Sequence, residues 1–127
     1  MNKDYLIISN NPLVKENFQD TIYFQGTLEE LLIKVRDMVH QGHELITHPL
    51  GASIRMMFSP YKSILVSSEK KEFNEFFASI AENSIEDYRK NTFNRKTDYQ
   101  HKNDYAMIDK ELLEEALKEH VSLRAIN

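Results

Sequence analysis

Polar residues that could bind a ligand stand where the expected strands end. Asn10 and Asn11 follow the apolar run YLII at 5–8, and His48 follows the short run ELI at 44–46. Asparagine can donate and accept hydrogen bonds, and histidine titrates near neutral pH. In open α/β sheets, ligands bind beside the carboxyl ends of the strands. The sequence therefore predicts a binding site at one edge of a sheet.

The connection between His48 and Lys62 supplies further candidate residues. It has no convincing helical pattern, and long structureless loops in compact domains are often functional. An arginine offers a planar fork for a carboxylate or phosphate, and free amides around Gly51 could cradle an anion. We expect a polar wall for a small anionic ligand, made of Asn10, Asn11, His48, Ser53 and Arg55, with Lys62 included only if the last strand runs antiparallel.

Residues 53–58, with the sequence SIRMMF, allow two structures. They form either a loop over the sheet edge or a strand, which the turn at Ser59-Pro60 would join to 63–67 as a hairpin. The direction of the strand at 63–67 is also open, because a parallel crossover normally contains a helix and none is evident. A parallel strand would place Lys62 at the edge opposite His48.

Met56, Met57 and Phe58 form an apolar group in this connection. Soft, flexible side chains on a loop can make an adaptable surface for a partner protein. The alternative interpretation is that at least two of the three pack beneath the loop as part of a core. Partner binding and core packing are both consistent with these residue types.

The rest of the pattern predicts the elements that position these residues. Strands are expected at 5–8, 21–24, 44–46 and 63–67, with helices between them. Asn11 is expected to cap one helix, and Thr27 with Glu30 to form a capping box on the next. We expect an α/β sandwich with a mostly parallel sheet of about four strands flanked by helices. Residues 1–127 form one domain in this interpretation, with an exposed connection at 91–104 and a C-terminal helix at 109–122 that Asp109 caps.

Composition excludes several classes of function. The chain has 127 residues, a formal net charge of −4 and no cysteine. Without cysteine there is no disulfide or thiolate chemistry, and without a basic face there is no general nucleic-acid binding. No apolar run is long enough to cross a bilayer, and the N-terminus lacks a signal-peptide core. We expect a cytoplasmic protein that requires no cofactor and binds neither nucleic acid nor membrane.

Metal binding and catalysis have little support in the residue spacing. His40 and His43 have a spacing that can bring two imidazoles together, but Gly42 interrupts the helix between them. No nucleophile motif, phosphate-binding loop or dinucleotide fingerprint is present. We therefore expect no metal site and assign no catalytic residues. The alternative is a small hydrolase or transferase that uses His48 as a general base.

Five segments of the chain form a recognisable combination. They are SNNPLV at 9–14, LIKVRDMVHQGHELITHPLGASIR at 32–55, PYKSILVS at 60–67, SIEDYRKN at 84–91 and MIDKELLEEALK at 107–118. Together they resemble the GrdX family, whose members are encoded beside the glycine, sarcosine and betaine reductase systems of amino-acid-fermenting anaerobes. The likeness covers almost the whole chain. One stretch departs from it, because IRMMFS stands between Gly51 and Pro60 where the family has a more polar loop with its own proline.

The resemblance implies an accessory component of reductive amino-acid fermentation. The reductases themselves depend on selenocysteine and cysteine chemistry. This chain has neither residue, so the resemblance implies a protein that is not a redox subunit. Its partner would be a reductase component or a small anionic ligand. The family carries no assigned catalytic residues that could be transferred to this sequence.

Overall fold

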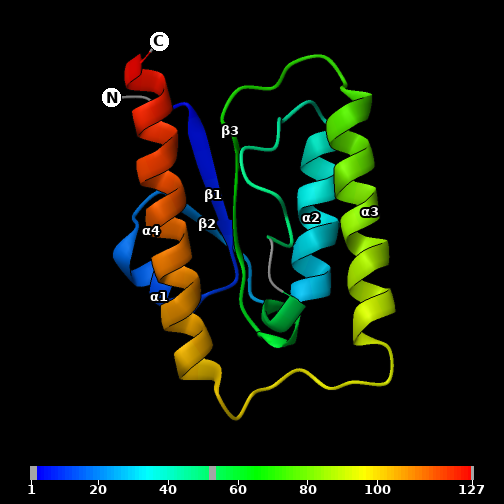
Figure 1. Ribbon diagram of the computed structural model, residues 1–127. Coiled ribbons are helices and arrows are strands. Elements are labelled where there is room, and N and C mark those ends of the chain that lie inside the picture. Colours follow the sequence, from blue (N-terminus) through cyan, green and yellow to red (C-terminus); the bar gives the residue numbers. More distant parts are fainter. Residues whose placement is uncertain (1–2, 52–53, 127) are drawn as a thin grey trace.

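The computed structural model describes residues 3–51 and 54–126, without the side chains of 54, 55 and 124–126. In the described residues the chain is a small α/β domain with a three-stranded mixed sheet and four α-helices. The elements in chain order are β1 (Tyr5–Ser9), α1 (Pro12–Asn17), β2 (Thr21–Tyr23), α2 (Leu28–His40), the 3₁₀ helix η1 (Ile54–Phe58), β3 (Ser63–Ser67), α3 (Glu75–Thr92) and α4 (Lys102–Ile126) (Figure 1).

The sheet corrects the predicted architecture. Its strand order is β2-β1-β3, with β1 parallel to β2 and antiparallel to β3. The prediction of about four mostly parallel strands is therefore wrong. Between α2 and β3 the described chain contains only the short η1, so it lacks the crossover helix that a parallel arrangement normally uses. The antiparallel register places Ser9 directly opposite Ser63.

Residues 44–46 do not form the expected strand. Leu45 makes an isolated antiparallel bridge with Val66 beside the outer edge of β3. The amides of Ile46 and Thr47 both donate to the carbonyl oxygen of Leu65, at 2.9 and 3.3 Å. A regular ladder cannot continue when two successive amides share one acceptor. This segment therefore covers the edge of β3 without extending the sheet.

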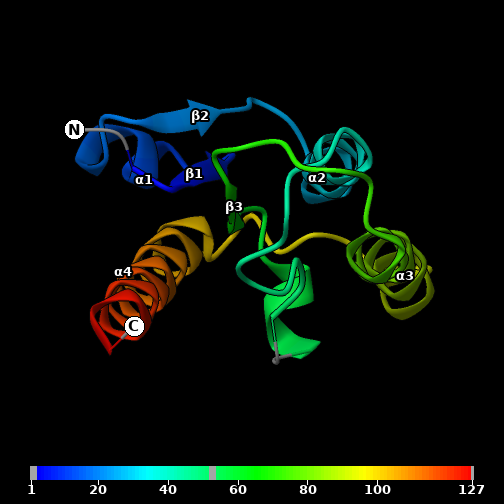
Figure 2. The ribbon, with the colours of Figure 1, turned by 90° about the horizontal axis from the view of Figure 1, so that it is seen from above.

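Helices cover both faces of the sheet. Figures 1 and 2 show α2 and α3 side by side on one face, with α4 on the other and α1 beside it. Alternate strand side chains follow these layers, as period-two strands require. The larger cluster, under α2 and α3, includes Ile8, Ile64 and Val66. The smaller cluster consists of Ile7, Val14, Leu65 and Leu113, with partly buried neighbours.

Local capping confirms the predicted starts of α1 and α2. The side chain of Asn11 accepts from the amide of Leu13 at 3.0 Å, and Pro12 follows in the first turn of α1. Thr27 and Glu30 form both bonds of the capping box of α2. No helix in the part of the chain that the structure describes is long and apolar enough to cross a membrane.

The sequence predicts a loop or a strand for the segment 53–58, and its described residues form neither. Residues 54–58 form the 3₁₀ helix η1. Its residue Met57 packs into the larger core cluster, while Met56 is buried on the side toward α4. Ser59 follows η1 and is buried too, with its hydroxyl donating to the carbonyl of Tyr61. This arrangement carries the chain into β3 from the edge that also holds Asn10.

Candidate functional site

The antiparallel direction of β3 places Lys62 at the same sheet edge as Asn10. The backbone amide of Lys62 donates to Asn10 Oδ1 at 2.8 Å, and Asn10 Nδ2 donates to the carbonyls of Gly26 and Pro60 at 3.0 and 2.9 Å. Asn10 is only 3% exposed. Its side chain therefore joins three chain segments at the predicted edge, and its hydrogen-bonding groups are already used within the protein.

Asn11 has a second function besides capping α1. Its Nδ2 donates to Asp109 Oδ2 at 3.0 Å and to the carbonyl of Ala106 at 2.9 Å, both in α4. Asn11 is fully buried. One asparagine thus fixes the start of α1 and attaches α4 to the end of β1.

Asp109 is the acceptor at the centre of a buried polar network. Its Oδ1 accepts from the amide of Ser63 at 2.9 Å, and its Oδ2 accepts from Ser63 Oγ at 2.7 Å. Because the hydroxyl hydrogen of Ser63 is directed at Asp109, Ser9 Oγ must donate to Ser63 Oγ across 2.7 Å. Ser9 Oγ in turn accepts from the amide of Asn11 at 3.0 Å. Three donors therefore converge on a single buried carboxyl group.

The charge of Asp109 is balanced mainly by these donors. Burial raises the pKa of the Asp109 carboxyl above its ordinary value, while the bonds from Asn11 and Ser63 and the charge of Lys62 oppose that rise. The three hydrogen bonds that reach the Asp109 carboxyl are all donated to it, which favours the ionised form.

The sequence pattern predicts Asp109 as a helix cap, and this prediction is wrong. The structure shows that α4 begins at Lys102, so Asp109 lies inside the helix. The available signal was that Asp109 stands four residues before the apolar Leu113, which places both on one helix face.

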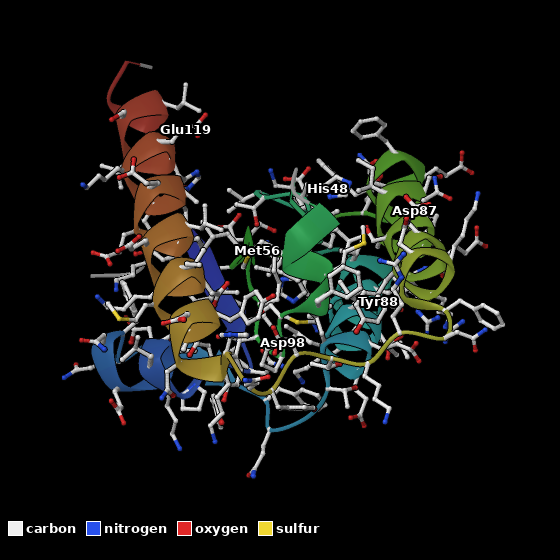
Figure 3. All side chains as sticks on the ribbon, turned by 60° about the horizontal axis from the view of Figure 1, so that its bottom comes forward. His48, Met56, Asp87, Tyr88, Asp98 and Glu119 are labelled. Carbon is white, nitrogen blue, oxygen red and sulfur yellow. The ribbon has the colours of Figure 1, made fainter. Side chains whose placement is uncertain are left out.

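A pocket of about 250 Å³ lies between β3, η1 and α4, and we call it the Lys62 pocket. Figure 3 shows Met56 between η1 and α4 and His48 near η1. The apolar walls of the Lys62 pocket come from the segment before η1, from η1 and from α4. The polar lining residues are Thr47, His48, Lys62, Ser63 and Asp109, and the apolar ones are Leu50, Met56, Leu112, Leu113 and Ala116.

Lys62 is the unusual residue of this pocket, since its side chain is buried without an ion-pair partner. The residue is 7% exposed, and in the described part of the chain no carboxylate lies within 4.0 Å of its amino group. Burial lowers the pKa of Lys62 from its ordinary 10.5, and the charge of Asp109 partly opposes this. An ammonium on a largely buried side chain without a close counter-ion costs stability, which makes this pocket the candidate site.

The loop beside Lys62 approaches its amino group closely. Gly51 has a φ of +69°, and a Cβ placed on it would lie 3.1 Å from Lys62 Nζ. Glycine adopts this left-handed conformation at little cost, and it leaves room for the amino group. Gly51 therefore serves both the turn of the loop and the space inside the pocket.

Of the remaining predicted binding residues, only His48 has a described side chain. His48 is exposed and lines the pocket, and its Nδ1 accepts from the amide of Leu50 at 3.2 Å. The neutral ring then carries its proton on Nε2, which makes that atom a donor. Ser53 lies outside the described residues. Arg55 belongs to η1, but its side chain lies outside the description.

The residues proposed for partner binding are largely covered. Met56 and Met57 are each 9% exposed, and Phe58 is half-buried with the guanidinium of Arg95 5.5 Å from its ring centroid. The carbonyl of Phe58 also accepts from the amide of Asp98 at 2.9 Å. These contacts leave little of the three side chains for a partner to cover.

A larger hollow of about 910 Å³ lies at the opposite edge, between the start of β1 and the C-terminal half of α4. Each basic side chain that lines it has an acidic partner. Lys3 pairs with Asp20 at 2.8 Å, His120 with Asp4 at 3.0 Å and Lys71 with Glu44 at 3.1 Å. Across the described residues no group of three or more potential metal ligands comes together.

The fold and the site define a small α/β domain with a mixed sheet, a buried polar network and a pocket beside a lysine. The chain belongs to the GrdX-like protein family, whose model matches residues 6–118. This confirms the resemblance seen in the sequence. The matched range includes Asn10, Asn11, Lys62 and Asp109, and therefore the whole candidate site. Neither the search of curated proteins nor that of solved structures found a match.

Proposed function

We propose that the chain is a cytoplasmic, non-redox accessory protein of reductive amino-acid fermentation that binds a small anionic ligand in the Lys62 pocket. The resemblance supports the first part, because it associates the family with glycine, sarcosine and betaine reductases of anaerobes. The absence of cysteine supports the non-redox role. A reductase component is the partner that the same resemblance implies.

One observation carries the ligand proposal. Among the described residues, the amino group of Lys62 has no carboxylate within 4.0 Å and no hydrogen-bonding partner, while the carboxyl group of Asp109 already accepts three hydrogen bonds. An anion would therefore complement the positive group of the pocket.

The other polar groups of the lining agree with an anion. Thr47 Oγ1 accepts from the amide of Leu65 at 3.0 Å, which leaves its hydroxyl hydrogen for another acceptor. His48 carries its neutral-state proton on Nε2, as its bond with Leu50 requires. The pocket volume of about 250 Å³ is below the usual range for drug-sized ligands, which favours a small molecule.

Thermal unfolding in the presence of candidate anions tests the proposal. We expect acetate, glycine, acetyl phosphate or phosphate to stabilise the fold by about 2.7 kcal/mol at a hundredfold excess over its dissociation constant. Sodium chloride at matched ionic strength controls for screening. The panel includes nucleotides, and no stabilisation by any of these compounds would contradict the proposal.

A pair of lysine variants locates the effect. Lys62→Met keeps a long apolar side chain and removes the amino group, so the stabilisation by the anion should be lost. Lys118→Met is the matched control, because the Lys118 side chain is 75% exposed on α4 and does not line the pocket. Equal responses of the two variants would place the anion elsewhere on the molecule.

A further inference from the structure

We infer that Lys62 can also form a reversible Schiff base with a small oxo acid, a molecule that carries a carboxylate beside an aldehyde or ketone group. This inference rests on the proposed function, since it uses the same pocket and the same anionic group. It goes further in naming the ligand class and a covalent step.

The geometry supplies the features that such a step needs. Lys62 is 7% exposed, and its amino group lies beside Gly51 at a pocket of about 250 Å³. It makes no hydrogen bond or ion pair within the described residues, so no contact must break before it attacks a carbonyl carbon. Burial also lowers its pKa, which increases the fraction of neutral, nucleophilic amine at neutral pH.

The pocket walls favour the imine over hydrolysis. Leu50, Met56 and Leu113 are buried apolar residues of the lining, and they limit the access of water to the reacting atoms. Thr47 and His48 provide donors for the carboxylate of the oxo acid. The carbonyl group of the ligand would thus lie against the amine of Lys62. Its carboxylate would accept hydrogen bonds from Thr47 and His48.

The step balances without an oxidant or reductant. The ammonium of Lys62 first loses one proton, and the neutral nitrogen forms a bond to the carbonyl carbon. The carbon–oxygen bond then breaks, and the oxygen leaves as water with two hydrogens that came from the ammonium. The third hydrogen stays on the nitrogen of the iminium ion, so the positive charge of Lys62 is kept. The same charge can still pair with the ligand carboxylate.

Reductive trapping tests the inference in the wild-type protein. The protein is incubated with pyruvate and sodium cyanoborohydride at pH 7, and the labelled lysines are identified by peptide mass spectrometry. Each unit by which a lysine pKa falls gives about tenfold more neutral amine at this pH. Lys62 should therefore be labelled ahead of the exposed Lys71 and Lys118. Labelling of Lys62 no faster than these two would overturn the inference.

Lys62→Arg separates this inference from the proposed function. Arginine keeps the positive charge but has no amine that forms an imine under these conditions, so the variant should still be stabilised by acetate or phosphate and should lose the pocket label. If acetate and phosphate do not stabilise the wild-type protein, anion binding is contradicted. Anion stabilisation without preferential labelling of Lys62 would contradict only the covalent step. Because the labelling is compared within the wild-type chain, this test does not depend on the folding of a variant.

Discussion

The two hollows of the molecule differ in size and in how their charges are satisfied. The larger one has a volume of about 910 Å³, and its basic lining residues Lys3, Lys71 and His120 each pair with a carboxylate. The Lys62 pocket has a volume of about 250 Å³, and Lys62, which is 7% exposed, makes no ion pair among the described residues. Surface ion pairs contribute little energy, whereas an uncompensated buried charge costs stability. A charged group without a nearby counter-ion is therefore a better criterion for a candidate ligand site than the volume of a hollow.

The difference extends to how each hollow is built. Around the larger hollow the paired side chains are mostly well exposed, with Lys71 60% and Lys3 49% exposed. Around the Lys62 pocket, Ser63 and Asp109 belong to a hydrogen-bonded network that is buried between the sheet and α4. The pocket wall on α4 thus depends on that network, and substitutions there should affect both stability and binding.

The largest expected effect comes from Asp109→Ala. The amide of Ser63 and Nδ2 of Asn11 would lose an acceptor in a buried site, so the free energy of unfolding should fall by about 3–5 kcal/mol. Urea unfolding followed by circular dichroism measures the change. The control is Glu111→Ala on the exposed side of α4, which should alter stability by at most about 0.5 kcal/mol. Similar small losses in both variants would show that the network does not hold α4.

An intermediate effect is expected for Gly51→Ala. The left-handed backbone at φ +69° costs a residue with a side chain about 1–2 kcal/mol. The new Cβ would also lie 3.1 Å from Lys62 Nζ, so the amino group must move and the affinity for the anion should fall. Calorimetric titration with acetate measures the affinity, and urea unfolding measures the strain.

A double-mutant cycle isolates the steric part of that effect. When Gly51→Ala is combined with Lys62→Met, the backbone strain persists but the contact with the amino group is gone. The two substitutions should therefore be coupled in the free energy of unfolding, measured without the anion. Unchanged anion affinity in the single Gly51→Ala variant would indicate that Lys62 does not reach the ligand from this side.

The smallest effect has the opposite sign. Lys62→Met should raise the free energy of unfolding by about 1 kcal/mol, because it removes a buried charge and keeps the apolar stem. Lys71→Met at the larger hollow should instead change it by at most about 1 kcal/mol in the unfavourable direction, since an exposed pair with Glu44 is lost. If Lys62→Met and Lys71→Met lower the free energy of unfolding equally, the proposed difference between the two hollows is wrong.

The gain from Lys62→Met should depend on pH in a defined direction. The pKa of Lys62 is lowered in the folded state, so the unfolded chain binds a proton more readily. The wild type therefore loses stability relative to the variant as pH falls from about 10.5 through the folded pKa, and the difference is constant below it. Urea unfolding of both proteins at pH 7 and pH 10.5 should show the larger difference at pH 7. A larger difference at pH 10.5 would contradict the direction of the pKa shift.

Local signals predicted the parts of the fold that depend on neighbouring residues. Asn11, Thr27 and Glu30 cap the helices as expected, because capping needs only a few residues in sequence. The placement of 44–46 failed because a strand needs a partner with regular register, and this segment makes one bridge with Val66. The direction of β3 depended on the whole connection before it, which local pattern does not determine.

The candidate site shows the same division. Asn10 and Asn11 lie at the predicted edge, but their side chains bind other parts of the protein. Lys62 was conditional on the strand direction, which the structure shows to be antiparallel. The sequence could place Asp109 on the buried face of its helix but could not show its hydrogen-bonding partners, because Asn11 and Ser63 are 98 and 46 residues away. Contacts of that range arise only from the tertiary fold.

The most direct test is to observe Lys62 itself during an anion titration. In protein labelled with ¹³C-lysine, the ε-carbon resonance that is absent from Lys62→Arg identifies Lys62. On addition of acetate or phosphate, we predict that this resonance shifts saturably and that the Lys62 pKa rises toward its ordinary value, because a bound anion favours the ammonium form. Lys118 should not respond in this way. A Lys62 resonance that stays unchanged, or that shifts no more than that of Lys118, would contradict anion binding in the Lys62 pocket.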